Sequence, residues 1–234
     1  MIKTGGIIFS RMNSTRLPGK AMMPINGVSL LERVINRSKL ISKIDHLCIA
    51  TSVKKEDDII ASFGKLKGID VFRGSLMDVA GRAIDAAEHF KYDHFIRICG
   101  DRPFLDYSIY DIMISTHLKN KNDLTTNIFP RTVPPGLTGE VISTTSLKKM
   151  YSMSLNNEDK EHVTRYYYKN PSQFSILNME FAFSKKNISA RLVIDDKEDL
   201  RRSTWIDTEM KKNNLKNNSE TVIYLTEKWQ KTKI

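Results

Sequence analysis

The first hundred residues alternate between short apolar runs and longer amphipathic runs, and this rhythm restricts the possible folds more than any other feature. Apolar runs bounded by turn residues indicate strands, whereas apolar residues at helical spacing behind capping residues indicate helices. Their alternation predicts a mostly parallel sheet with helices on both faces, a doubly wound α/β fold. The expected strands span 7–9, 45–51, 69–72 and 94–99, and the expected helices span 29–40, 57–68 and 76–90.

The chain has 234 residues, of which 40% are hydrophobic, so it can bury one large core, and a single domain over residues 1–234 is expected. Ser29, with Glu32 three residues later, predicts a capping box at the first helix. A helix over 107–118 and a closing helix around Val222, Leu225 and Trp229 complete the pattern.

The loop after the first strand carries three cations within ten residues, namely Arg11, Arg16 and Lys20. Pro18 restricts the backbone and Gly19 frees it, which shapes a turn. Two guanidinium groups and one ammonium suit the oxygens of a phosphate chain, so the loop is predicted to bind a triphosphate. A solvated basic loop that only closes the strand is the alternative.

Two better-known phosphate motifs do not match. Lys20 is followed by Ala21 rather than Ser or Thr, and Ser14 stands where a Walker loop has Gly, which argues against a P-loop NTPase. The net charge of +10, from 37 Lys and Arg against 27 Asp and Glu, makes a basic nucleic-acid-binding protein the non-enzymatic alternative. The basic runs lack the interleaved aromatic residues that single-strand binders use, so nucleic acid is not the expected partner.

The string Arg11-x-x-Ser14-x-Arg16-Leu17-Pro18-Gly19-Lys20 resembles the signature of the spore-coat polysaccharide cytidylyltransferase family, which is related to the CMP-KDO and CMP-sialate synthetases. The resemblance implies a nucleotide-diphospho-sugar transferase fold of the GT-A-like type. It implies a nucleotide-binding half over about 1–120 and an acceptor-side half, with a small subdomain or loop region, over about 121–234. It also implies nucleotide binding by Arg11, Ser14, Arg16, Gly19 and Lys20, of which Arg11 and Lys20 are further implied to be catalytic.

A second site is expected where the strand over 94–99 ends in Gly100 and Asp101. Ligands of open α/β sheets bind at the carboxyl ends of the strands, and a carboxylate there suits Mg²⁺ that bridges nucleotide phosphates. The family's Gly-Asp-x-Pro motif implies that Asp101 is a catalytic metal ligand. An ordinary strand-ending turn is the alternative.

The segment over 191–200 is predicted to form a short strand followed by the acidic start of a helix. It resembles the family's LTVDTPEDL segment, which implies that Asp195 supplies a second metal carboxylate. Asp196 and Lys197 stand where the family has Thr and Pro. The expected cofactor is therefore Mg²⁺, held by Asp101 and Asp195.

The likeness also covers Val71 to Ser75 and continues through Asp78 to Arg82. In relatives this region lies beside the nucleotide base and the bound sugar, which makes Ser75, Asp78 and Arg82 candidates for nucleotide binding. The alternative is that Ser75 caps a helix that begins at Leu76, while Arg82 pairs with Asp78 one turn away.

The acceptor is expected beside a Pro- and Gly-rich loop and the Glu-His-Val-Thr segment that follows it. Both resemble family segments, so Arg131, Glu140 and His162 are acceptor-binding candidates together with Arg102. Arg131 and Glu140 have the alternative role of fixing the loop, and His162, on a predicted helix, that of a structural histidine. Arg102 and Thr138 depart from the family pattern, which leaves the identity of the acceptor open.

Cys48 and Cys99 lie in apolar runs, which favours buried reduced thiols over a disulfide and predicts a cytoplasmic protein. After Met1 the chain enters its first strand without an apolar leader, and no stretch approaches the ~18 apolar residues of a membrane span. The consecutive tyrosines at 166–168 cannot share one face, and a partner subunit that covers one of them is compatible with the expected homodimer.

These features predict a Mg²⁺-dependent cytidylyltransferase that transfers CMP from CTP to an oxygen of a small acidic, sugar-like acceptor and releases pyrophosphate. Such an enzyme would serve surface polysaccharide or glycoconjugate synthesis. The preference for CTP rests on the family resemblance. Transfer of another nucleotide to a sugar phosphate or another small acceptor is the alternative among enzymes.

Overall fold

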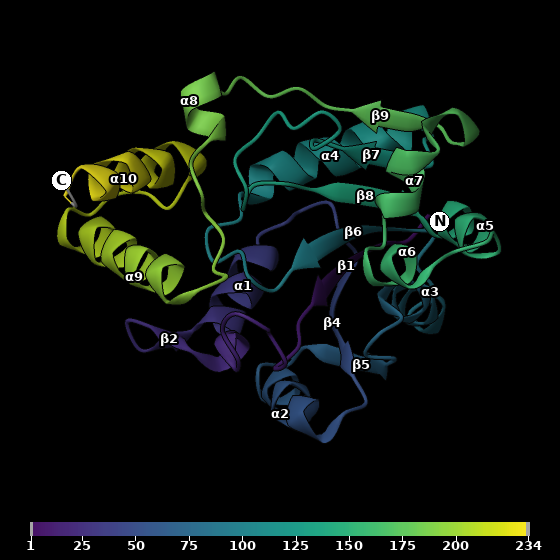
Figure 1. Cartoon of the computed structure of the whole chain (residues 1–234), viewed down its shortest axis with the longest axis horizontal. Helices are drawn as coiled ribbons and strands as arrows, with labels where there is room; N and C mark the ends of the chain where they lie inside the picture. Colours follow the sequence, from purple (N-terminus) through teal and green to yellow (C-terminus); the bar gives the residue numbers. More distant parts are fainter. Residues whose placement is uncertain (1, 233–234) are drawn as a thin grey trace.

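The computed structural model describes residues 2–232, which form a twisted sheet between two layers of helices (Figure 1). The strands of this sheet are β1 (Thr4–Phe9), β4 (His46–Ser52), β5 (Asp70–Gly74), β6 (His94–Cys99), β7 (Leu124–Thr126), β8 (Glu140–Ser143) and β9 (Ile176–Asn178). A separate hairpin joins β2 (Pro24–Ile25) to β3 (Val28–Ser29).

The longer helices are α1 (Leu30–Ser38), α2 (Asp58–Leu66), α3 (Val79–His89), α4 (Tyr107–Asn120), α5 (Thr144–Tyr151), α9 (Lys197–Lys212) and α10 (Ser219–Lys231). The shorter ones are α6 (Asn157–Glu161), α7 (Arg165–Lys169) and α8 (Lys185–Ile188). Single 3₁₀ turns are η1 (Lys20–Met22), η2 (Lys55–Asp57) and η3 (Pro171–Gln173).

The strand order β5-β4-β1-β6-β8-β7-β9 makes this a doubly wound sheet. The chain moves outward from β1 to β4 and β5, then returns to place β6 on the other side of β1, with all these pairings parallel. Only β8, within the described chain, runs antiparallel to its neighbours β6 and β7. The prediction of a mostly parallel, doubly wound α/β fold is therefore confirmed.

Two apolar cores hold the layers together, one on each face of the sheet. Because side chains alternate along a strand, Ile8 packs into the core beneath α1, α4, α9 and α10, whereas Ile7 packs into the core beneath α3, α5 and α7. Both isoleucines are fully buried. The closing helices α9 and α10 lie together at one side of the molecule, at the left of Figure 1, where the rings of Trp205 and Trp229 are 5.4 Å apart.

Three local predictions were wrong. The helix expected over 76–90 begins at Val79, because Asp78 rather than Ser75 caps it by accepting the N–H of Gly81 at 2.7 Å. His162 lies between α6 and α7 rather than on a helix. The segment before α9 forms no strand, although the N–H of Ile194 bonds to the carbonyl of Asp101 at 3.0 Å.

The capping box at α1 is half formed. Ser29 accepts the N–H of Glu32 at 3.2 Å, but the Glu32 carboxylate contacts Lys67, which directly follows α2, instead of returning to Ser29. Both cysteines are free, with Cys48 buried and Cys99 partly exposed. From residue 2 to residue 232, every helix is too short or too polar to cross a membrane.

Candidate active site

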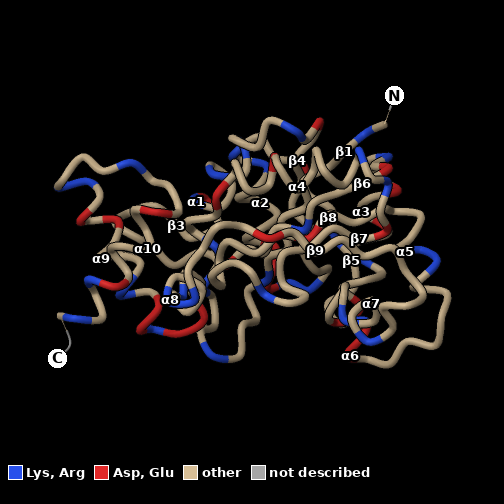
Figure 2. Tube along the Cα trace, turned by 90° about the horizontal axis from the view of Figure 1, so that it is seen from above, with Lys and Arg blue, Asp and Glu red and all other residues tan. Residues whose placement is uncertain are grey.

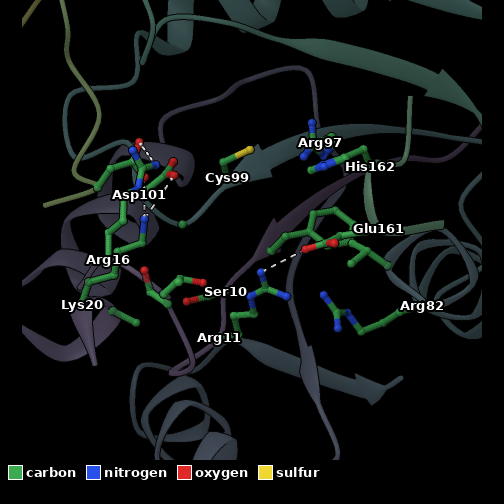
Figure 3. A pocket seen from close by; sticks show the side chains of 17 residues that line it. Ser10, Arg11, Arg16, Lys20, Arg82, Arg97, Cys99, Asp101, Glu161 and His162 are labelled. Atoms are coloured by element: carbon green, nitrogen blue, oxygen red, sulfur yellow. Dashed lines mark hydrogen bonds and ion pairs between the residues drawn. The ribbon is translucent and has the colours of Figure 1, made fainter. Parts of the chain in front are cut away.

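A cavity of about 400 Å³ opens at the carboxyl ends of β1 and β6 (Figure 3). This is the point where the strand order reverses, and open α/β sheets bind ligands there. Gly100 allows the two strand ends to approach, because a Cβ at this position would lie 2.9 Å from the carbonyl oxygen of Phe9 and 3.0 Å from the Cβ of Ser10.

The loop between β1 and η1 folds around the backbone of Met12. The Met12 carbonyl accepts the N–H groups of Ser14 at 2.9 Å and Gly19 at 2.8 Å, and its own N–H donates to Oδ1 of the buried Asp57 at 2.7 Å. Gly19 has a φ of +77°, a left-handed conformation that favours glycine. Four predicted residues of this loop line the cavity: Arg11, Ser14, Arg16 and Lys20.

Lys20 lies between two carboxylates that are far apart in the sequence. Its Nζ is 3.1 Å from Oδ1 of Asp195 and 3.5 Å from Oδ2 of Asp101, and it donates to the carbonyl of Ile194 at 2.8 Å. Arg16 contacts Oδ2 of Asp195 at 2.9 Å. Burial would raise the pKa of Asp195, but the adjacent Lys20 and Arg16 hold this pKa below its usual value.

Asp101 and Asp195 thus converge on one ammonium group, so the protein already holds a cation between them. Mg²⁺ prefers hard oxygen ligands and is usually bound by one or two carboxylates together with substrate phosphates. In the described part of the chain, no group of three or more His, Cys, Asp or Glu side chains could hold a metal ion. The chemistry of the pair fits a Mg²⁺ ion whose remaining ligands would have to come from a bound substrate.

Glu161 and Arg82 line the cavity on the side away from Lys20, and Arg11 of the loop extends toward Glu161 (Figure 3). Nη2 of Arg11 is 3.3 Å from Oε1 of Glu161, and each side chain is 37% exposed. Arg82 is buried and forms no ion pair within residues 2–232, while its guanidinium donates to the carbonyl of Ser75. Burial and the nearby charge of Arg11 lower the pKa of Arg82 to about 10. Such an under-neutralised guanidinium favours an anionic or carbonyl ligand.

Glu140 anchors a buried network beside this wall. Its Oε2 accepts from Arg97 on β6 at 2.5 Å, and its Oε1 accepts the hydroxyls of Thr164 and Tyr168, both at 2.6 Å. Burial would raise the pKa of Glu140, but Arg97 and the two hydroxyl donors hold this pKa below its usual value. Because Arg97 also lines the cavity, the network fixes a cation at the cavity wall.

Ser75 and Asp78 line a second, smaller cavity of about 140 Å³, and Arg82 lines both cavities. Asp78 is partly engaged elsewhere, since one carboxylate oxygen caps α3 and the other accepts the hydroxyl of Tyr151 at 2.5 Å. Ser75 accepts the N–H of Asp78 at 3.0 Å. The structure therefore groups Arg82, but not these two residues, with the loop cations.

The residues predicted to bind the acceptor also lie in different places, some at the main cavity and some outside it. His162 lines the main cavity close to Arg97 (Figure 3). Arg102 lies outside the lining and donates to the carbonyl of Thr138 and to the hydroxyl of Tyr110, the latter at 3.3 Å, so it ties down the Pro- and Gly-rich loop. Arg131 on that loop is exposed and also lies outside the lining.

Sequence reasoning assigned no role to Arg97, Glu161 or Asp57. Arg97 carried a usable signal, because a charge within an apolar strand requires a partner. Glu161 sits next to His162 in the sequence, but its contact with Arg11 spans 150 positions and is visible only in the fold. Asp57 resembled an ordinary acidic residue at a helix start.

A doubly wound sheet with a cationic loop and paired carboxylates at its switch point is the arrangement expected of a nucleotidyltransferase. A family model described as cytidylyltransferase matches residues 6–228. The chain therefore belongs to the cytidylyltransferase family, and it is an enzyme of the nucleotidyltransferase class.

Individual relatives agree with this assignment. The chain is 36% identical over 198 residues to the spore coat polysaccharide biosynthesis protein SpsF of Bacillus subtilis, which covers 82% of this chain and 81% of that protein. It is similar to the structure of a cytidylyltransferase from Leptospira borgpetersenii, with a TM-score of 0.90, 28% identity, and coverage of 99% and 96% of the two chains.

A CMP-KDO synthetase solved in complex with CTP shares the fold at 14% identity, with a TM-score of 0.68 over 88% of this chain and 99% of that one. The predicted resemblance to the cytidylyltransferase family is thereby confirmed, and the mostly parallel α/β sheet matches that of nucleotidyltransferase-type structures.

Proposed function

We propose that this protein transfers CMP from CTP to a hydroxyl of a small acidic, sugar-like acceptor, with Mg²⁺ as cofactor and pyrophosphate as the second product. The observation that carries the proposal is the convergence of three loop cations with Asp101 and Asp195 on one cavity. Family membership supports the cytidylyl group. The CTP complex of the structural neighbour and the spore-coat relative support CTP as donor and a role in surface polysaccharide or glycoconjugate synthesis.

In this proposal the protein works by positioning and by electrostatics rather than by covalent chemistry. Arg11, Arg16 and Lys20 bind phosphate oxygens and neutralise the charge that develops on the departing pyrophosphate. Asp101 and Asp195 would hold Mg²⁺, which when bound would supply polarisation of the phosphate and of the acceptor oxygen. His162 lines the cavity, and its proposed role is to contact the acceptor.

The acidic nature of the acceptor is supported by the excess of cations on the wall away from Lys20. Within residues 2–232 Arg82 forms no ion pair, and Arg97, which donates to Glu140, presents a charged group at the lining. Arg102 contributes by fixing the loop that carries Arg131. Planar guanidinium groups suit a carboxylate.

Pyrophosphate release with each of four ribonucleoside triphosphates, measured against a panel of acceptors, tests the proposal. The panel holds nonulosonic acids, other acidic sugars, phosphonate- or amino-acid-like acceptors and phosphates of sugars that have no carboxylate. We expect release with CTP and an acidic acceptor. If UTP or GTP is preferred by more than about tenfold, equal to ~1.4 kcal/mol, the cytidylyl assignment fails while the nucleotidyltransferase assignment stands.

A cytoplasmic location and a homodimer remain predictions. For the basic nucleic-acid-binding alternative, the structure offers no specific support, since Lys and Arg are interspersed with Asp and Glu along the trace (Figure 2). That alternative would show steeply salt-sensitive retention of nucleic acid. A gel shift at two salt concentrations distinguishes it.

A further inference from the structure

Three carboxylates line the cavity, and Glu161 differs from the other two. Asp101 and Asp195 both contact Lys20 and fit a Mg²⁺ ion. Glu161 stands on the opposite wall, where a single contact of 3.3 Å links it to Arg11 (Figure 3). Both side chains are partly exposed, and an ion pair of this kind is weak enough to be replaced by a stronger anion.

The segment that carries Glu161 is firmly held, so an exchange of partners needs only a side-chain movement. Asp159, two residues earlier, is buried and accepts from Arg165 at 2.7 Å and from Lys169 at 3.3 Å. Asn156 closes a capping box with Asp159 at the start of α6. Thr164, three residues after Glu161, is bound to Glu140.

We propose that Glu161 is a partner-exchanging carboxylate that couples the two substrates. It holds Arg11 while the cavity is empty, loses Arg11 to a nucleotide phosphate, and then accepts hydrogen bonds from hydroxyl groups of the acceptor. The inference rests on the proposed function, because it takes Arg11 as a phosphate ligand. It follows that nucleotide binding completes the acceptor subsite and that the acceptor binds second.

The first test is calorimetry with Mg²⁺ and a non-hydrolysable CTP analogue. Glu161→Gln removes the anion that competes for Arg11, so the analogue should bind about two- to fivefold more tightly, the range expected of an exposed ion pair. If Glu161 instead holds Arg11 in its binding position, the same substitution weakens binding. Weaker or unchanged affinity overturns the proposal.

A double-mutant cycle separates competition for Arg11 from a general loss of negative charge. In an Arg11→Ala background, Glu161→Gln should leave the affinity for the analogue unchanged. If Glu161→Gln still increases the affinity for the analogue when Arg11 is absent, the effect comes from the net charge of the cavity and not from competition for Arg11. That result would overturn the proposal. Glu158→Gln is the matched control, because Glu158 lies on α6, pairs with Arg165 and is absent from the cavity lining.

The acceptor half of the proposal is tested with whichever acceptor supports pyrophosphate release in the panel. Glu161→Gln should raise the KM for that acceptor about tenfold, the effect of losing one charge-assisted hydrogen bond. An unchanged acceptor KM overturns this half. If the wild-type protein does not bind the CTP analogue at all, the proposed function fails. If the wild-type protein binds the analogue and Glu161→Gln does not change the affinity, only the proposed exchange of partners is refuted.

Discussion

The cavity has two walls that the chain builds in opposite ways. The loop wall consists of Arg11, Arg16 and Lys20, which lie within ten residues and are partly exposed. The network on the opposite side consists of Arg97, which lines the cavity, and of Glu140, Thr164 and Tyr168, which lie outside the lining; its members come from three separate parts of the chain and share the buried carboxylate of Glu140. Exposed charges are free to exchange partners, whereas buried ones cannot lose a partner without large cost. Substitutions in the loop wall should therefore change ligand binding, and substitutions in the network should change stability.

The largest effect is expected from Glu140→Gln, which removes the buried carboxylate that pairs with the partly buried Arg97. Breaking a buried ion pair in this way costs about 3–5 kcal/mol of unfolding free energy. Urea unfolding measures it. Glu88→Gln is the control, because Glu88 and its partner Lys148 are both about half exposed and their pair is expected to contribute little. If Glu140→Gln lowers the unfolding free energy by less than about 1 kcal/mol, the network contributes no more stability than an exposed ion pair. The contrast between the loop wall and the network would then be wrong.

Asp101→Asn and Asp195→Asn should each reduce turnover by about 10²-fold or more, the scale of losing a fixed electrostatic contact in an active site. Both carboxylates are partly exposed, so the unfolding free energy should change little. Steady-state pyrophosphate release at saturating Mg²⁺ gives the readout. The exposed Asp70→Asn on β5 serves as control. Near wild-type turnover in either site variant would show that its residue is not a metal ligand.

Arg16→Ala and Lys20→Ala should weaken binding of a non-hydrolysable CTP analogue by about tenfold, because each removes one charged contact to phosphate. The acceptor KM should stay within about twofold, since these cations belong to the loop wall. Calorimetry and acceptor titrations provide the two values, with the exposed Lys43→Ala as control. Unchanged nucleotide affinity in both variants would exclude the loop from the site.

A smaller effect concerns acid stability. The pKa of Glu140 is lower in the folded protein than its ordinary value of 4.5, so its ionised form stabilises the fold above that pH. This contribution is lost as pH falls through the lowered pKa of the folded state. The stability gap between wild type and Glu140→Gln should therefore be full near neutral pH and shrink below about pH 4.5. A gap that does not change with pH would mean that the carboxylate is not ionised in the fold.

The same comparison explains which features could be predicted from sequence. The loop wall is contiguous, and Asp101 lies two residues after a readable strand, so residue types, spacing and the family resemblance were sufficient to place them at the same edge of the sheet. The network depends on the antiparallel pairing of β6 with β8, which brings Arg97 near Glu140 across 43 positions, and no local pattern encodes it.

The local predictions that were wrong also failed because contacts between distant parts of the chain decided the structure. Ser75 and Asp78 are both competent caps, and the choice between them was made by tertiary contact, because the hydroxyl of Tyr151 holds the carboxylate of Asp78. The apolar segment before α9 has the composition of a strand. Its N–H groups, however, meet the loop carbonyls of Pro135 and Asp101 instead of a neighbouring strand.

The central claim is that a nucleoside triphosphate and its metal ion occupy the space between the loop wall and the paired carboxylates Asp101 and Asp195. A crystal structure with a non-hydrolysable CTP analogue and Mn²⁺, located by its anomalous scattering, tests this claim most directly. We predict an anomalous peak bound by Asp101 and Asp195, with the phosphates on Arg11, Arg16 and Lys20. A metal bound elsewhere, or phosphates that contact none of these three cations, would contradict the claim.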